Sequence, residues 1–189
     1  MNAPNLRRTG ALVAALLLSL GGCTSGEQQA AESEIDTIGG RLADAMGRPL
    51  PDTTASSLWI YLERVSYGDA WALWPGMGEL YGGSEPHGLL LTTYVNSAAH
   101  EAADAHAGEM PRGAIVVKEA HLPTHELDNI TVMYKVEGYA PEHGNWFFAK
   151  YLPDGTVEAE GRVETCRECH MEGPDYIRTA GFGAAADEG

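Results

Sequence analysis

The segment Cys166-Arg167-Glu168-Cys169-His170 constrains the fold of this chain more than any other feature. Two cysteines three positions apart, followed directly by a histidine, form the C-x-x-C-H pattern of covalent haem attachment. On a helical turn the two thiols and the imidazole share one face, so each thiol can add to a vinyl group while the histidine binds the iron. The chain is therefore expected to hold one covalent haem c, with Cys166, Cys169 and His170 as cofactor-binding residues and His170 as the metal ligand.

Two other interpretations of the cysteine pair are weaker. A structural zinc site needs four ligands, and because the chain has only three cysteines it would require two further histidines. A thioredoxin-like dithiol lies at the start of a helix after the first strand of a βαβ unit, whereas this pair follows several predicted strands.

The residue opposite His170 on the iron decides the class of haem protein. A methionine or histidine there makes an electron carrier, whereas an open position binds small molecules. Seven histidines and six methionines are present, so composition leaves the question open. Met77, Met110 and Met133 are candidate ligands, although methionine at such positions more often packs in the core.

Residues 1–22 are typical of a signal peptide. Arg7 and Arg8 precede an apolar run that is too short to span a bilayer, and Leu20-Gly21-Gly22-Cys23 resembles the lipobox of bacterial lipoproteins. An ordinary cleaved signal that ends near a cysteine is the alternative. We expect lipidation of Cys23 and anchoring in the bacterial cell envelope. Because Thr24 follows, we expect the periplasmic face of the outer membrane.

The chain is strongly acidic, with 12 basic and 27 acidic side chains and a net charge of −15. Removing residues 1–22 takes away two arginines and no acid, which makes the net charge −17. Such a chain cannot offset phosphate repulsion, so nucleic acid is excluded as a partner. The charge is typical of a solvated surface, and it can also steer a basic redox partner.

The mature chain is expected to contain one domain of the α+β class. Residues 23–54 are predicted to be the lipidated N-terminus, a tether and a lead-in, 55–180 the haem domain, and 181–189 a flexible tail. Ser56 or Ser57 is expected to cap a helix over 58–65, and an alanine-rich helix is expected before Gly108. Strands are predicted at Leu89–Asn96, Ala114–His121, Ile130–Glu137, Trp146–Leu152 and Thr156–Glu160. The expected architecture is a mainly antiparallel β-sheet with flanking helices and a C-terminal haem c attachment motif.

Several stretches together resemble the cytochrome P-460 family over residues 59–177. They are HGLLLTTYVN, MPRGAIVVKEA, ITVMYKVEGY, GNWFFAKYLPDG and CRECH, in this order and spacing. The resemblance implies a homodimer with a five-coordinate haem c and, in the name-giving members, a lysine joined to a porphyrin meso carbon. It also implies oxidation of hydroxylamine to nitrous oxide or nitric oxide, with electrons passed to a soluble acceptor.

Lys118 is the lysine that matches the family's cross-linked residue. Strand alternation places Lys118 with Ala114 and Val116 on one face, and Ile115 with Val117 on the other. A solvent-facing lysine is the alternative, and Lys135 and Lys150 also lie on predicted strands.

The sequence departs from the family in the distal pocket. Hydroxylamine-oxidising members carry a glutamate on the strand after the lysine strand, where this chain has Met133 as the expected distal lining. Glu137, four residues on, is a candidate for proton relay. An apolar cap is similar to that of the related cytochromes c′-beta, which bind nitric oxide, and a six-coordinate electron-transfer cytochrome is a further alternative. Four aromatic residues are expected to lie in the core: Tyr134, Trp146, Phe147 and Phe148.

Overall fold

The computed structural model describes residues 44, 46–179 and 182–183. The chain falls into two units, residues 1–40 and 41–189, and the first lies outside the described residues. The predicted signal peptide and Cys23 therefore also lie outside them. Within the described part of the chain, no helix has the length and apolar character needed to cross a membrane.

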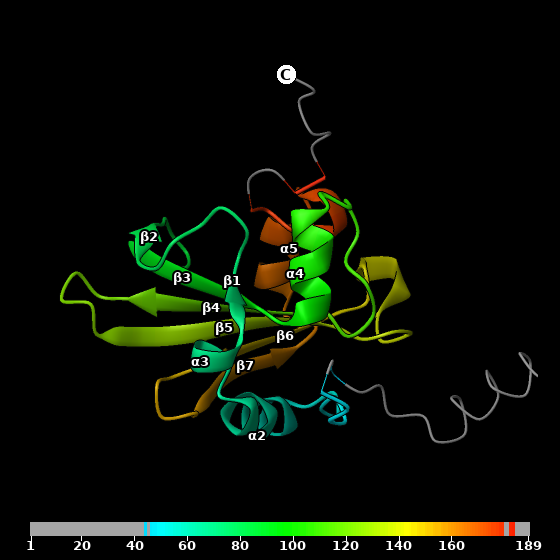
Figure 1. The fold of residues 1–189 in the computed structure, drawn as a ribbon, viewed down its shortest axis with the longest axis horizontal. Coiled ribbons are helices and arrows are strands. Elements are labelled where there is room, and N and C mark those ends of the chain that lie inside the picture. The colour runs from blue at the N-terminus through cyan, green and yellow to red at the C-terminus, as the bar shows by residue number, and fades with distance from the viewer. Residues whose placement is uncertain (1–43, 45, 180–181, 184–189) are drawn as a thin grey trace, which may run out of the picture. The chain divides into compact units, whose positions relative to one another are not determined.

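The centre of the fold is one antiparallel sheet (Figure 1). Its strands run in the order β1-β3-β4-β5-β6-β7, and β2 also pairs with β3. The bounds are β1 Ala72–Leu73, β2 Tyr81–Gly82, β3 Leu90–Val95, β4 Ile115–His121, β5 Leu127–Lys135, β6 Trp146–Tyr151 and β7 Val157–Gly161. The predicted α+β class is confirmed, as are the five longer strands. The two-residue strands β1 and β2 were not predicted, because they fall in a stretch rich in tryptophan and glycine.

Short helices cover both faces of the sheet. Figure 1 shows α2 (Ala55–Val65) on one face, and α4 (Ser97–Asp104) with α5 (Glu164–His170) on the other. The remaining helices are α3 (Tyr67–Ala70) and the short 3-10 helices η1 (Pro141–His143) and η2 (Pro174–Tyr176). The α5 helix therefore lies over the same face of the sheet as α4.

The predicted cap of α2 is wrong. The cap is Thr54, whose side chain accepts a hydrogen bond from the backbone N–H of Ser57 at 3.2 Å. The hydroxyl of Ser57 instead accepts a hydrogen bond from the backbone N–H of Asp52 at 3.0 Å. Because an N-cap oxygen bonds the N–H two or three residues later, the helix begins at Ala55, three residues earlier than the predicted start at residue 58.

The two faces of the sheet pack into two separate hydrophobic clusters. Ile115 and Val117 pack in the first cluster, which includes the buried face of α2. Ala114 and Val116 pack in the second, which includes α4 and the flank of Cys166. This confirms the predicted alternation along β4. The four aromatic residues are buried as predicted, Tyr134 and Phe147 in the first cluster and Trp146 and Phe148 in the second.

Packing also involves residues outside 55–180. Leu50 is buried in the first cluster. Phe182 is buried in the second, and its ring centroid lies 6.0 Å from that of Trp74. The segment that follows α5 is thus anchored on the same face of the sheet as α5 itself.

Candidate functional site

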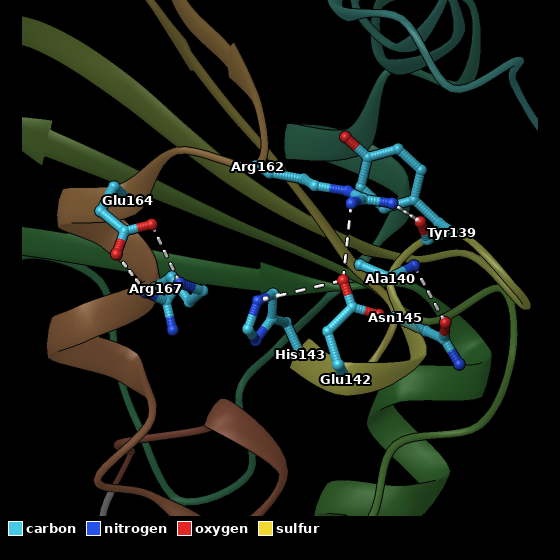
Figure 2. Close-up of polar contacts among 8 residues, drawn as sticks. All are labelled: Tyr139, Ala140, Glu142, His143, Asn145, Arg162, Glu164 and Arg167. Atoms are coloured by element: carbon cyan, nitrogen blue, oxygen red, sulfur yellow. Dashed lines mark hydrogen bonds and ion pairs between the residues drawn. The ribbon is translucent and has the colours of Figure 1, made fainter.

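The α5 helix is attached to the sheet through the junction that precedes it. Arg162 donates to the backbone carbonyl of Tyr139 at 2.5 Å and pairs with Glu142 at 3.4 Å. Figure 2 shows this group, with His143 beside Glu142 and Arg167 paired with Glu164 on α5 itself. The β5–β6 connection therefore holds the start of the helix that carries both cysteines.

Cys166 and Cys169 lie one helical turn apart on α5. Cys166 is half-buried against the second hydrophobic cluster, and burial raises the pKa of its thiol. Cys169 is exposed and lines a cavity beside the helix. Two thiols one helical turn apart can each reach a vinyl group of the same porphyrin.

His170 is the last residue of α5, and its ring is fixed on one side. Its Nδ1 lies 2.8 Å from the backbone carbonyl of Tyr176, to which it donates. This bond sets the tautomer and leaves Nε2 as the lone-pair nitrogen, the arrangement found in metal-bound histidines. Burial lowers the pKa of His170, which favours the neutral form that binds metals. The ring centroid of Phe148 lies 5.7 Å away, so the sheet supports the imidazole.

A cavity of about 390 Å³ opens beside His170 and Cys169. Lys118 lines it from β4, while His87 and Met77 line it from the loops around β2. Lys118 pairs with Thr93 on β3 and with Thr131 on β5, and burial lowers the pKa of its ammonium group. The structure thus brings together three of the predicted site residues, Lys118, Cys169 and His170.

The other two lysines make ion pairs. Lys135 pairs with Asp175 at 2.5 Å, and Lys150 pairs with Glu158 at 2.8 Å. Of the three lysines, Lys118 is the one that lines the cavity beside His170. The resemblance and the geometry therefore select the same lysine.

The structure does not bring Met133 or Glu137 to this cavity. Met133 faces the correct side of the sheet, but it is 8% exposed and packs between Val116 and Phe148, its partners on β4 and β6. Because β5 ends at Lys135, Glu137 follows the strand, is exposed and lines a different cavity. Of the three candidate methionine ligands, Met77 lines the cavity of His170, whereas Met110 is buried beside α4.

Sequence reasoning missed His87, which lies in the loop before β3. Its ring centroid is 5.9 Å from that of His170, and its Nδ1 lies 3.3 Å from the Thr131 hydroxyl. Burial, followed by the charges of Lys118 and His170, lowers the pKa of His87 to about 4. His87 belongs to the family-like stretch HGLLLTTYVN, but no spacing rule connects it with a histidine 83 positions later.

A carboxylate was missed as well. Glu85, two residues before His87, is the only acidic side chain among the described residues that line this cavity. It stands in a turn sequence, Ser84-Glu85-Pro86, which by itself indicates only a loop.

The donor set fits a covalently attached haem. Two thiols lie one turn apart, an imidazole has one nitrogen tied and one free, and an adjoining cavity is bordered by a lysine. Among the described residues, no group of three or more histidine, cysteine, aspartate or glutamate side chains is arranged to hold a metal ion.

Fold and site together define a c-type cytochrome built on an antiparallel sheet. A comparison with protein families matches the cytochrome P460 family over residues 83–177, about half of the chain, and this span includes the C-x-x-C-H motif. The chain belongs to the cytochrome P460 family. Proteins of this family carry haem c, so one covalent haem c is the cofactor of this chain. A comparison with curated proteins found no match.

Proposed function

We propose that this cytochrome oxidises hydroxylamine to nitrous oxide or nitric oxide. In this proposal Cys166 and Cys169 carry the haem, His170 binds its iron, and Lys118 is bonded to the porphyrin edge. The haem supplies an iron that binds the substrate nitrogen and accepts its electrons.

One observation carries the proposal: Lys118 lines the same cavity as Cys169 and His170. Burial lowers the pKa of Lys118. A larger fraction of its side chain is therefore the neutral amine, which is the form that makes covalent bonds. Strand β4 fixes its position because Lys118 is hydrogen-bonded into the middle of the sheet, between Thr93 and Thr131.

Mass spectrometry of the digested holoprotein tests the proposal. We expect the haem-bearing Cys166–His170 peptide to remain joined to the peptide that contains Lys118. Trypsin cleavage after an unmodified Lys118 would rule out the cross-link and with it the proposed enzyme. A haem peptide joined instead to Lys150, which faces the same side of the sheet, would show that the cross-link forms on β6 and not at Lys118.

Hydroxylamine oxidation releases protons, and the cavity offers two groups that can take them. Glu85 and His87 border the cavity from the same loop. Burial lowers the pKa of His87 to about 4, so its imidazole is neutral at pH 7 and can pass a proton on without retaining it. We assign the proton relay to this loop, in place of Glu137.

Nitric oxide binding without turnover is a second candidate function. It is favoured by the sequence at Met133, which stands where hydroxylamine-oxidising members of the family carry a glutamate and which packs between Val116 and Phe148. A protein of this kind would bind nitric oxide at the ferrous iron but would not reduce an electron acceptor when given hydroxylamine. A stopped-flow assay with both ligands separates the two functions.

A six-coordinate electron carrier is a third candidate, favoured by the position of His87. Its ring is close to that of His170, and its Nδ1 is engaged by Thr131. The spin state of the ferric iron separates this candidate from the other two.

We further propose that the chain is anchored by a lipid on Cys23 at the periplasmic face of the outer membrane. The support is the sequence Leu20-Gly21-Gly22-Cys23 after an apolar run. Substitution of Cys23 by serine is expected to move the protein from the membrane fraction to the soluble fraction, with haem content unchanged.

The proposed homodimer is tested by the mass of the purified protein in solution. The proposed soluble electron acceptor is tested by the reduction of added basic cytochromes.

A further inference from the structure

We propose that the buried ion pair between Lys135 and Asp175 is a positioning device for the iron ligand. It holds the backbone carbonyl that orients His170. The inference rests on the proposed role of His170 as the haem ligand, and it concerns residues that lie outside the cavity of Lys118.

The carbonyl that receives the His170 proton lies in an unusual stretch of backbone. Asp175 has φ 45° and Tyr176 has φ 64°, both in the left-handed region that non-glycine residues rarely adopt. Such a conformation persists only where surrounding contacts hold it. Tyr176 accepts the hydrogen bond from His170 Nδ1 at 2.8 Å, so the unusual backbone bears directly on the histidine.

Asp175 is held from three directions. Its Oδ1 lies 2.5 Å from Lys135 Nζ, and its Oδ2 accepts a hydrogen bond from the backbone N–H of Met110 at 2.7 Å. Its carbonyl accepts a hydrogen bond from the Trp146 indole at 2.9 Å. Both carboxylate oxygens are therefore engaged, and the side chain is only 9% exposed.

Lys135 is a rigid anchor for this contact. It is the last residue of β5 and pairs with Trp146 on β6. Its ammonium group lies 5.1 Å from the centre of the Trp146 ring, and its side chain is 8% exposed. The pair thus connects the end of the sheet to the segment that follows α5.

Close packing leaves this segment few alternative paths. A side chain at Gly173 would overlap the carbonyl of Ile177. A Cβ at Gly144 would lie 2.9 Å from the Tyr176 ring. The backbone therefore approaches both neighbours closely, and the ion pair selects the position of the Tyr176 carbonyl within that narrow space.

The position of this carbonyl sets the donor strength of the iron ligand. A histidine that donates its second N–H to an oxygen becomes a stronger base toward its metal. If the ion pair is removed, the left-handed backbone relaxes and the bond to Tyr176 weakens. The iron–histidine bond then weakens too, and the ferric state loses stabilisation relative to the ferrous state.

The test uses the haem-loaded protein with Asp175→Asn, Lys135→Met and the double variant. A single substitution leaves an unpaired buried charge and can impair folding, whereas the double variant removes both charges together. The readouts are the iron–histidine stretching band of the ferrous protein by resonance Raman spectroscopy and the haem reduction potential. We expect a lower band frequency and a more positive potential in the double variant.

A matched control is the pair of Arg48 and Asp44, which lie 2.6 Å apart beside Tyr61 of α2. Removing both of these charges is expected to leave the band and the potential unchanged. An unchanged band and potential in the Lys135 and Asp175 double variant would overturn the inference. Hydroxylamine turnover is not a readout. The experiment therefore tests the inference even if the protein binds haem through His170 but does not oxidise hydroxylamine.

Discussion

The imidazole rings of His87 and His170 lie with their centroids 5.9 Å apart and their planes at 88°. Two imidazoles bound to opposite sides of one metal ion have centroids about 6 Å apart, given metal–nitrogen bonds of about 2 Å. Because the proposed function needs an open iron position, we expect a high-spin ferric spectrum in the wild-type protein and in His87→Ala. Electron paramagnetic resonance measures this directly. A low-spin wild-type spectrum that becomes high-spin in His87→Ala would establish His87 as the sixth ligand.

Lys118→Met is expected to abolish the cross-link while leaving the haem attached through its cysteines. The Soret band should move from a markedly red-shifted position to that of an ordinary haem c. Lys150→Met is the matched control, because Lys150 lies in the same register row of the sheet, two strands away. A red-shifted band that survives in Lys118→Met would show that Lys118 is not the modifying residue.

Glu85→Gln is expected to lower hydroxylamine turnover by about 100-fold, the usual effect of removing a positioned proton acceptor. Haem content and nitric oxide affinity should not change, since the amide keeps the shape of the side chain. Glu126→Gln, an exposed carboxylate in the β4–β5 turn, serves as the control. Equal turnover in both variants would remove Glu85 from the proton path.

Met133→Glu is expected to destabilise the fold by about 2–4 kcal/mol without increasing turnover. The carboxylate would lie in the apolar cluster between Val116 and Phe148 rather than in the cavity. Chemical denaturation of this variant beside Met133→Leu measures the cost. A gain in hydroxylamine turnover would instead place residue 133 at the substrate.

Alkaline pH is expected to destabilise the protein because its buried tyrosines resist ionisation. Burial raises the pKa of Tyr134 to about 12 and also raises the pKa of Tyr61 and Tyr151 above the ordinary value of 10.0. Above pH 10 the unfolded chain releases these protons and the folded chain keeps them, so the free energy of unfolding falls as pH rises. At pH 11 each tyrosine should contribute a loss of about 1.4 kcal/mol.

Thermal unfolding between pH 8 and pH 11 measures this effect. Tyr151→Phe should be less stable at pH 8, because it loses the hydrogen bond to the Ala55 carbonyl at 2.8 Å. Its stability should also fall less steeply above pH 10, because one ionising group is gone. A curve parallel to that of the wild type would contradict the assignment.

Local pattern was sufficient for the strands and for the face of β4 that carries Lys118. Alternation with a period of two decides which side chains share a face, and this property does not depend on distant parts of the chain. The cap of α2 was misplaced because Thr54, Ser56 and Ser57 all have suitable hydroxyls. In the structure the Ser57 hydroxyl accepts a hydrogen bond from the backbone N–H of Asp52, and Thr54 caps the helix.

The sequence alone determined the cofactor, because the spacing of Cys166, Cys169 and His170 is a covalent requirement contained within five residues. It also determined the fold class and the candidate lysine. Only the tertiary structure decided what surrounds them. His87 and Glu85 reach the cavity through a loop, and Tyr176 reaches His170 through a left-handed turn stabilised by Lys135. These contacts join residues far apart in the chain, and their formation depends on sheet register and close packing, which linear spacing does not specify.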